Sequence, residues 1–506
     1  MGEHVDVLIV GAGLSGIGAA YHVQQAFPKR MYVILESRNA IGGTWDLFRY
    51  PGVRSDSDMQ TLGYRFRPWT GDKAIADGPS ILRYVRDTAA EAGIDRHIRF
   101  GYRVTGASWS SADARWTVEA THQAPQPASP DAPAPETVTF TCNFLLICTG
   151  YYRYDHGYRA DLPGIENFGG QVVHPQQWPD DLDYAGKRVA VIGSGATAVT
   201  IVPAMAETAA HVTMVQRSPT YIISVPSEDP IDAKLRKRVG ARRAYPVTRW
   251  KNVAVSTLIY QLSQRRPQMM RNWIRGMTVK QLPSGYDVDT HFKPVYGPWD
   301  QRLCLVPDGD LFRSIRDGKA SVVTGQIATF DEHGVRMESG EEVAADIVVT
   351  ATGLQLLALG GIQLTVDGED VRLPETMAYK ATMLSGVPNF AITIGYTNAS
   401  WTLKADLVSE FVCRLLRYMD RHGYDVVVPE NDDPRVTERP LLDFAAGYIL
   451  RSMHEFPKSG SRAPWRLGMS YLNDVVSLRH GRLGDGALKF SRRGARLARR
   501  PTELVR

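Results

Sequence analysis

Two glycine-rich turns have the spacing of nucleotide-phosphate sites. Residues 11–16 read GAGLSG, and residues 193–198 read GSGATA. The first glycine of such a motif permits a tight turn, the second lets a pyrophosphate approach the backbone, and a small third residue lets a helix pack on a strand. The N-terminus of that helix then offers N–H donors to the phosphate. The chain therefore has two candidate dinucleotide sites.

The residue about 20 positions after each turn distinguishes the two sites. Glu36 ends the apolar run 31–36, and a carboxylate there accepts hydrogen bonds from ribose hydroxyls, which suits FAD or NAD. Arg217 takes the corresponding place after the second turn. Arginine binds a 2′-phosphate in bidentate fashion, whereas a carboxylate would repel it. We expect FAD at the first site and NADPH rather than NADH at the second.

The apolar runs before each turn predict the strands that position these sites. Residues 5–10 and 189–192 are each followed by a glycine turn and a helix-like stretch, as in a buried parallel sheet. Two further apolar strands, 144–150 and 346–353, end in Thr-Gly, which permits close passage to a cofactor. The stretch before residue 144 predicts a β-meander, with an exposed proline-rich loop at 121–136. The predicted class is α/β, with two Rossmann-like dinucleotide-binding domains.

Length and composition exclude several classes of protein. A chain of 506 residues is too long to fold around one hydrophobic core and suggests roughly three domains. Its 43% hydrophobic and 22% charged residues are typical of soluble globular proteins. Four scattered cysteines, at positions 142, 148, 304 and 413, fit neither a disulfide framework nor a zinc site, so we expect no metal. A disulfide reductase needs a cysteine pair beside its flavin, and Cys142 and Cys148 on a strand pattern fit that poorly.

The longest uncharged run, residues 7–28, is long enough to span a bilayer. No basic residues precede it, as they would in a signal peptide, and four glycines interrupt it. A strand, a turn and a helix explain it better. We expect a soluble, cytoplasmic protein.

Two longer motifs resemble those of the flavin-dependent Baeyer–Villiger monooxygenases. Residues 42–56, GGTWDLFRYPGVRSD, match GGxWxxxxYPGxxxD, and residues 168–180, FGGQVVHPQQWPD, match FxGxxxHxxxWPD. Related amine and sulfide monooxygenases share FxGxxxH but usually lack WPD. The stretches 43–59, 299–313 and 395–411 look most like mycobacterial members of the family. The resemblance covers most of the chain.

The resemblance implies that NADPH reduces FAD, that a flavin peroxide forms with O2, and that one oxygen atom enters a ketone to give an ester or lactone. It also implies oxidation of sulfides and thioamides. Two alternatives stay open: a flavin monooxygenase acting mainly on nitrogen or sulfur, and a basic membrane-surface or nucleic-acid-binding protein with a vestigial flavin fold.

The same resemblance implies a catalytic arginine, which stabilises developing anions, and an aspartate that orients it. The motif assigns the aspartate to Asp56. We expect the arginine to be Arg302, with Lys293 as its competitor, and pairing of Arg302 with Asp300 is the structural alternative. His174 and Trp178 belong to the linker motif; in the family this histidine couples cofactor position to domain movement, and a simple hinge role is the alternative.

The glycine turns and the resemblance together give two sets of cofactor residues. The FAD set is Gly11, Gly13, Ser15, Gly16, Glu36, Thr44, Trp45, Asp46, Leu47, Asp56 and Val104. The NADPH set is Arg54, Ser55, Asp56, Gly193, Ser194, Gly195, Ala196, Thr197, Ala198, Val199, Thr200, Arg217 and Ser218. A helix beginning after Thr397-Asn398 either faces the flavin pyrimidine ring or is only a capped core helix.

We expect four regions along the chain. Residues 1–150 form the first part of an FAD-binding domain and 151–184 a linker. Residues 185–350 form an NADPH-binding domain with a helical insertion at about 228–285. Residues 351–506 form the second part of the FAD-binding domain and a basic C-terminal tail.

The net charge of +5 is distributed unevenly. Residues 231–282 hold thirteen basic residues and one acid, and residues 489–506 hold seven basic residues and one acid. Trp250, Ala254, Leu258 and Leu262 keep helical spacing, which predicts an amphipathic helix. These segments are either solvated surface or a site of peripheral contact with anionic membrane. Nucleic acid is not expected, because no recognition motif is present.

Overall fold

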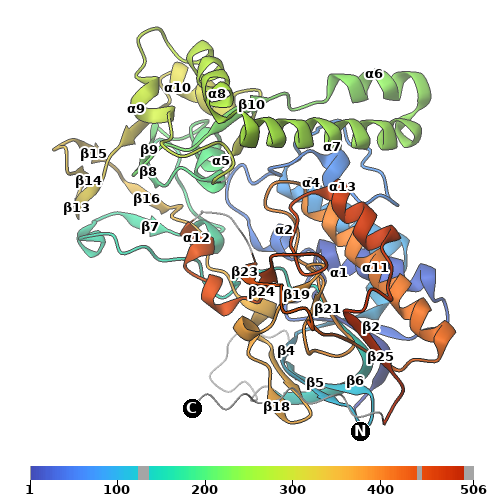
Figure 1. Cartoon of the computed structure of the whole chain (residues 1–506). Coiled ribbons are helices and arrows are strands. Elements are labelled where there is room, and N and C mark those ends of the chain that lie inside the picture. Colours follow the sequence, from blue (N-terminus) through green and yellow to red (C-terminus); the bar gives the residue numbers. More distant parts are fainter. Residues whose placement is uncertain (1, 123–135, 302, 442–446, 495–506) are drawn as a thin grey trace.

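The larger sheet combines strands from both ends of the chain. The computed structural model describes residues 2–122, 136–301, 303–441 and 447–494, and Figure 1 shows their arrangement. The strand order is β18-β17-β4-β5-β6-β1-β2-β3, with β21 also beside β6. The bounds are β1 His4–Val10, β2 Tyr32–Glu36, β3 Ile98–Phe100, β4 Tyr102–Ser110, β5 Arg115–His122, β6 Glu136–Ile147, β17 Gln363–Val366, β18 Glu369–Asp370 and β21 Phe390–Ile392.

This sheet has a parallel half and an antiparallel half. Strands β3, β2, β1, β6 and β21 run parallel, as their apolar sequences predict. Strands β4, β5 and β6 form the predicted antiparallel meander. The predicted proline-rich loop lies almost wholly outside the described residues.

Helices from distant parts of the sequence cover the parallel half. Helix α1 (Leu14–Ala26) packs against α11 (Trp401–His422), and α4 (Gly78–Glu91) lies beside α1. The short helices α2 (Thr44–Leu47) and α3 (Met59–Leu62) lie between α1 and α4 in the sequence. Ile9, Ile17, Leu407 and Phe411 are fully buried in one core, so the two ends of the chain fold together. Helix α11 ends at Gly423, whose φ of +65° favours glycine.

The second sheet is entirely parallel, in the order β12-β9-β8-β16-β7. Its strands are β7 Gln171–Val173, β8 Arg188–Ile192, β9 His211–Gln216, β12 Ala320–Thr324 and β16 Ile347–Thr350, with helices α5 Ala196–Met205 and α10 Asp310–Arg316 against it. The predicted linker thus does more than connect, because its residues 171–173 supply an edge strand. A small antiparallel sheet follows, formed by β13 Ile327–Asp331, β14 Gly334–Met337 and β15 Glu342–Ala344.

Four helices lie between β10 (Ile222–Val225) and β11 (Cys304–Pro307). They are α6 Pro230–Val239, α7 Ala241–Arg265, α8 Pro267–Gln281 and α9 Val288–Phe292. The predicted amphipathic helix is confirmed as α7, but its apolar stripe faces solvent: Trp250 is 49% and Leu258 57% exposed. Within the described residues, no helix combines the length and apolarity needed to cross a membrane.

The C-terminal part closes around the first sheet with short elements. These are β19 Ala378–Tyr379, β20 Met383–Leu384, β22 Val426–Pro429, β23 Glu438–Pro440, α12 Gly447–Leu450, β24 Lys458–Gly460, α13 Tyr471–Asp474 and β25 Leu488–Ser491. The start of the predicted basic tail is therefore a strand, since β25 pairs with β22. Lys489 and Arg493 form ion pairs with Asp432 and Asp113 at 2.6 and 3.2 Å. Residues 495–506 lie outside the described residues.

Candidate functional site

The first glycine turn leaves a cradle where α1 begins. Gly11 has φ +102°, and a Cβ there would lie 2.7 Å from the carbonyl oxygen of Cys148. A Cβ on Gly16 would lie 1.8 Å from the Gly11 carbonyl oxygen, so helix and strand meet as the motif predicts. Gly13 is the N-cap of α1 and provides no capping side chain. The first N–H groups of α1 are thus left for an anionic ligand, and this fits a dinucleotide pyrophosphate.

Glu36 supplies a buried carboxylate at the end of β2. Its oxygens accept hydrogen bonds from the backbone N–H groups of Ala12 at 2.7 Å and Arg38 at 2.8 Å. Burial raises the pKa of Glu36, and these two donors oppose that rise. The residue lines the cavity described below, which suits an acceptor for ribose hydroxyls.

The second glycine turn has the same local design. Gly193 has φ +134°, and a Cβ there would lie 2.3 Å from the carbonyl oxygen of Ala351. Gly195 is the N-cap of α5, again without a capping side chain. The Ser194 hydroxyl donates to the carbonyl of Ser218 at 3.1 Å and thereby ties the turn to the loop after β9. Arg217 in this loop is exposed, and no described carboxylate forms an ion pair with it.

One cavity of about 350 Å³ is lined both by the first glycine turn and by the first residues of α5. The predicted residues that line it are Gly11, Gly13, Ser15, Glu36, Thr44, Trp45, Arg54, Asp56, Val104, Ala196 and Thr197. The predicted residues that lie outside its wall are Gly16, Asp46, Leu47, Ser55, His174, Trp178, Gly193, Ser194, Gly195, Ala198, Val199, Thr200, Arg217 and Ser218. The predicted Arg302 lies outside the described residues. The first residues of α5 therefore face the same space as the first glycine turn.

Several residues that were predicted to bind the cofactors form ion pairs or hydrogen bonds with other residues of the protein. Asp46 is buried and pairs with Arg38, and with Arg86 at 3.0 Å, so its carboxylate holds the turn at α2. The buried Ser55 hydroxyl accepts a hydrogen bond from the Ala76 N–H at 3.2 Å. Arg54 lines the cavity and also pairs with Asp310, the first residue of α10. This ion pair joins the loop before α3 to the second sheet's helices.

The two candidate catalytic residues that the structure describes differ in position. Asp56 lies on the cavity wall with its side chain accessible. Lys293, the competitor for the catalytic cation, lies outside the wall, is 60% exposed and pairs with Asp289 at 3.6 Å. Asp300 accepts a hydrogen bond from the Gly297 N–H at 2.7 Å and so closes its own turn. The position of Lys293 argues against a role at the cavity.

Comparison with known proteins identifies the family. Residues 77–358 match the model of the flavin-binding monooxygenase-like family, and residues 9–68 match that of an NAD(P)-binding Rossmann-like domain. The chain belongs to the flavin-binding monooxygenase-like family. It is 56% identical to the FAD-containing monooxygenase EthA of Mycobacterium tuberculosis (strain CDC 1551 / Oshkosh), over 98% of this chain and 99% of that protein. EthA of Mycolicibacterium smegmatis (strain ATCC 700084 / mc(2)155) is 54% identical, again over 98% and 99%.

Solved structures share the fold of this flavin-binding monooxygenase. An oxidized steroid monooxygenase bound to NADP covers 97% of this chain and 100% of its own, with a TM-score of 0.75 at 22% identity. The open crystal structure of cyclohexanone monooxygenase gives a TM-score of 0.72 at 18% identity, over 97% of this chain and 100% of its own. The predicted α/β fold and the likeness to mycobacterial members are confirmed, and the chain is a flavin-binding monooxygenase with a match to an NAD(P)-binding Rossmann-like domain.

Much of the aromatic wall of this monooxygenase's cavity was not predicted from the sequence. Trp401, the first residue of α11, lines it and donates its indole N–H to the Ser15 hydroxyl at 2.7 Å. Tyr396 lines it too and donates its hydroxyl to Asp474 at 2.6 Å. Asp474 also pairs with buried Lys404 at 2.9 Å. The other aromatic wall residues that were not predicted are Phe48, Tyr50, Tyr102, Tyr151, Tyr152 and Tyr154. The sequence features that could have pointed to these wall residues are the two Thr-Gly strand ends and the stretch 395–401.

The linker histidine, His174, packs closely against its neighbours. Its Nδ1 accepts the Gln176 N–H at 3.1 Å, and a Cβ on Gly157 would lie 1.9 Å from the ring. Burial lowers the pKa of His174, which favours the neutral ring. The Gln176 side chain donates to the carbonyls of Arg153 at 2.7 Å and Tyr154 at 3.2 Å. The motif thus supports the chain next to Tyr154, a cavity residue.

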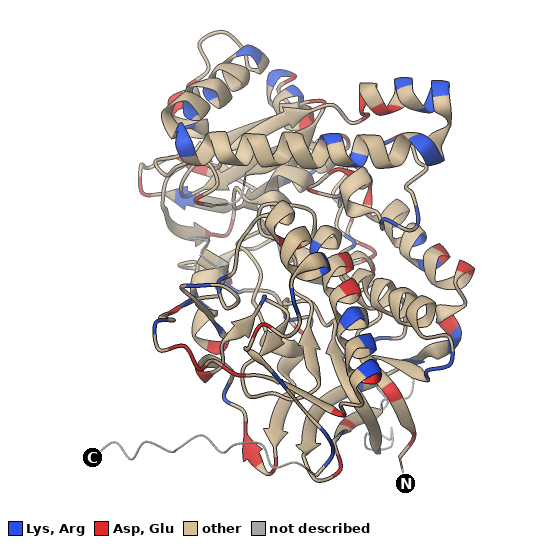
Figure 2. Cartoon of the chain, turned by 45° about the vertical axis from the view of Figure 1, so that its right-hand side comes forward, with Lys and Arg blue, Asp and Glu red and all other residues tan. Residues whose placement is uncertain are grey.

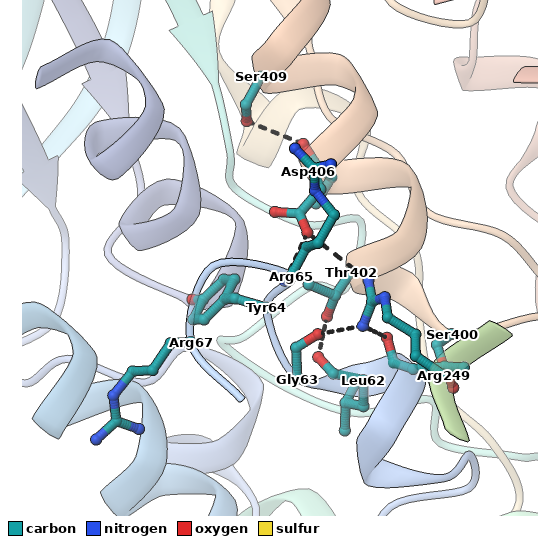
Figure 3. A network of polar contacts seen from close by, with 12 residues as sticks. Leu62, Gly63, Tyr64, Arg65, Arg67, Arg249, Ser400, Thr402, Asp406 and Ser409 are labelled. Atoms are coloured by element: carbon teal, nitrogen blue, oxygen red, sulfur yellow. Dashed lines mark hydrogen bonds and ion pairs between the residues drawn. The ribbon is translucent and has the colours of Figure 1, made fainter. Parts of the chain in front are cut away.

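A buried arginine ties the helices α6–α8 to the first sheet's helices. Figure 3 shows Arg249 of α7 directed at the end of α3, where it donates to the carbonyls of Gln60 and Gly63, both at 2.7 Å. Thr402 of α11 donates to the Leu62 carbonyl in the same network. Asp406 of α11 accepts the Arg65 N–H at 3.1 Å. One network therefore fixes α7 and the N-terminal half of α11 around the segment that follows Asp56.

Proposed function

We propose that this enzyme catalyses the Baeyer–Villiger oxidation of a ketone to an ester or lactone. The observation that carries the proposal is that Asp56, from a motif shared with Baeyer–Villiger enzymes, lies on the wall of a cavity that is also lined by the first glycine turn and by the first residues of α5. Bound FAD, reduced by NADPH, supplies the activation of O2. We further propose that the enzyme oxidises sulfides and thioamides, including ethionamide-type compounds.

The chain's own groups have distinct proposed roles in holding the cofactors. The N-terminus of α1 binds the FAD pyrophosphate and Glu36 the ribose hydroxyls. The N-terminus of α11, where Trp401 is fixed by Ser15, faces the flavin pyrimidine ring. Ala196 and Thr197 contact the NADPH pyrophosphate, and the exposed Arg217 binds its 2′-phosphate.

The proposed chemical step needs a fixed cation and a dry site. A cation lowers the free energy of the anion that develops when the ketone carbonyl is attacked. We propose Arg302 for this role, with Asp56 orienting its guanidinium. The aromatic wall residues and Trp401 exclude water, because they present apolar ring surface to the cavity.

Substitution of the proposed cation tests this assignment. Arg302→Ala should retain NADPH-dependent flavin reduction under anaerobic conditions and lose ester or lactone formation, since the cation acts after reduction. Undiminished ester formation would exclude Arg302. Lys293→Ala is the matched control and should leave ester formation unchanged.

A second candidate function is oxygenation mainly of nitrogen or sulfur, which the similarity to EthA leaves open. Product analysis with purified enzyme on matched panels of ketones and sulfides separates the two. Ester or lactone products support the first proposal, whereas sulfoxides alone support the second. We propose a cytoplasmic location, in keeping with four cysteines that are all buried and free.

A further inference from the structure

Helices α6 and α7 form a hairpin that projects from the body of the protein (Figure 1). The region where the two helices meet carries five exposed cations: Lys234, Lys237, Arg238, Arg242 and Arg243. Figure 2 shows these basic bands at the outer end of the hairpin. Among the described residues no carboxylate pairs with any of the five, and the sequence contains no acid between Asp232 and Asp287.

Folding sorts the cations of this segment into two groups. Arg236 pairs with Asp232 at 2.5 Å, and Lys251 pairs with Asp229. Arg249 is buried and lies 3.7 Å from Asp406. These inward cations are neutralised inside the protein. The five cations in α6 and the first turn of α7 that pair with no described carboxylate therefore lie at the outer end of the hairpin, and two further exposed arginines, Arg265 and Arg266, lie at the opposite end of α7.

Apolar side chains accompany these cations on the outer face of α7. Val247 is 55%, Trp250 49% and Leu258 57% exposed. Arg243, Val247, Trp250 and Leu258 share one face of the helix, because their spacing follows its 3.6-residue period. Single exposed apolar side chains are common on protein surfaces, but several grouped together mark an interaction site.

The apolar face continues onto a neighbouring element. The ring of Trp250 lies 5.9 Å from that of Tyr471, the first residue of α13. Leu472 beside it is 46% exposed, and Val476 one turn further is 65% exposed. The surface thus spans two segments more than 200 residues apart in sequence.

The inner face of α7 holds this surface in a fixed orientation. Besides the Arg249 bonds, the Tyr245 hydroxyl donates to the Tyr64 carbonyl at 2.9 Å, and Thr248 donates to Asp232 at 2.8 Å. All of these groups are buried. Ala244 and Val253 are buried on the same inner face, while Val247, Trp250 and Leu258 stay exposed.

We propose that the outer end of the hairpin, defined by Lys237, Arg238, Arg242, Arg243, Val247 and Trp250, binds the surface of a bilayer that contains anionic lipids. Lysine and arginine are attracted to lipid phosphates, while tryptophan and valine enter the boundary between headgroups and acyl chains. A second copy of the chain fits less well, because it would bring the four exposed cations of this surface against the same four. Nucleic acid would leave the apolar side chains without a partner.

Vesicle binding tests the proposal with the full-length, FAD-loaded protein. It should co-sediment with phosphatidylcholine vesicles that contain phosphatidylglycerol at low salt, and release at high salt. Arg242→Gln with Arg243→Gln should lower the partition coefficient about 10- to 30-fold, at about fivefold per cation. Val247→Ser should lower it by a factor that salt does not change.

A matched pair of substitutions provides the control. Lys187→Gln with Lys319→Gln removes the same charge from exposed positions next to β8 and β12, and should leave vesicle binding unchanged. Flavin absorbance and NADPH oxidation should remain normal in every variant, so failure of the oxygenation proposal would not affect this test. Three results would overturn the proposal: no binding at low salt, equal binding to neutral vesicles, or an equal loss in the control. A change of oligomeric state in the Arg242/Arg243 variant, by sedimentation velocity without vesicle binding, would assign the surface to a second copy instead.

Discussion

The guanidinium of Arg249 and the carboxylate of Asp406 lie 3.7 Å apart, both almost fully buried. Arg249 belongs to α7 and Asp406 to α11, whose first residue reaches the cofactor cavity. His22 of α1 also contacts Asp406, at 3.3 Å. The helices that carry the cationic surface are therefore joined to the helix whose first residue lines the cavity.

Loss of the Arg249 side-chain charge should destabilise the protein strongly. Arg249→Met leaves Asp406 with one fewer cation and removes the donor that satisfies the carbonyls of Gln60 and Gly63. Breaking a buried ion pair from one side costs about 3–5 kcal/mol. Urea unfolding of purified protein should show a decrease in the free energy of unfolding of that order.

Arg265→Met is the matched control, because Arg265 ends the same helix and is exposed. It should change the free energy of unfolding by less than about 0.5 kcal/mol. Equal effects of the two substitutions would mean that the buried network contributes nothing specific to stability.

Arg217 should determine the choice between NADPH and NADH. Arg217→Gln removes the exposed guanidinium proposed to bind the 2′-phosphate, and a hydrogen bond to a charged group contributes about 1.5–3 kcal/mol. KM for NADPH should therefore rise roughly 10- to 100-fold, while KM for NADH stays constant. Steady-state NAD(P)H oxidation measures both values.

Lys319→Gln serves as the control for Arg217, since it removes an exposed cation from the same part of the chain. It should leave both KM values unchanged. Parallel increases in KM for the two nucleotides after Arg217→Gln would contradict a specific contact with the 2′-phosphate.

The nucleotide turns were predictable because their signals are local. Strand, glycine turn, helix and terminal Glu36 all fall within the first 36 residues, and each residue type has one clear physical reason. The contact between Trp401 and Ser15 joins residues 386 positions apart, and no periodicity contains that information. Helical spacing likewise predicted α7 but not its buried face. That face mixes apolar residues with polar ones, since Thr248 and Arg249 form hydrogen bonds there beside Ala244 and Val253.

The bond between Trp401 and Ser15 should contribute to cofactor retention. Trp401→Phe keeps a smaller aromatic ring at this position and removes the indole N–H that donates to the Ser15 hydroxyl, and the loss of ring volume is matched in the control Trp273→Phe. Loss of one neutral hydrogen bond costs about 1 kcal/mol, so FAD should bind about fivefold more weakly. Flavin fluorescence on dilution measures the dissociation constant. Trp273→Phe, at an exposed position on α8, should leave FAD affinity unchanged, and equal weakening by both would contradict the role of this bond.

The carboxylate of Asp346 should contribute to the free energy of unfolding at neutral pH, and this contribution should disappear in acid. The carboxylate accepts hydrogen bonds from the Arg188 side chain at 2.6 and 3.2 Å and from the Arg188 backbone N–H at 2.8 Å. These donors lower the pKa of Asp346 to about 2. The folded pKa lies below the unfolded value of 3.8, so the ionised group stabilises the fold above that pH. The contribution is lost as the pH falls to about 2.

Asp346→Asn tests this pH dependence. Because the Asp346 side chain is 39% exposed, solvent screening reduces the expected effect to about 1 kcal/mol at neutral pH. The difference in the free energy of unfolding between variant and wild type, from urea titrations across the acid range, should shrink toward zero as Asp346 becomes protonated. Glu207→Gln removes an exposed carboxylate from the same part of the chain and should show no such trend. A difference for Asp346→Asn that stays constant down to about pH 2 would mean that the ion pair with Arg188 does not stabilise the sheet through charge.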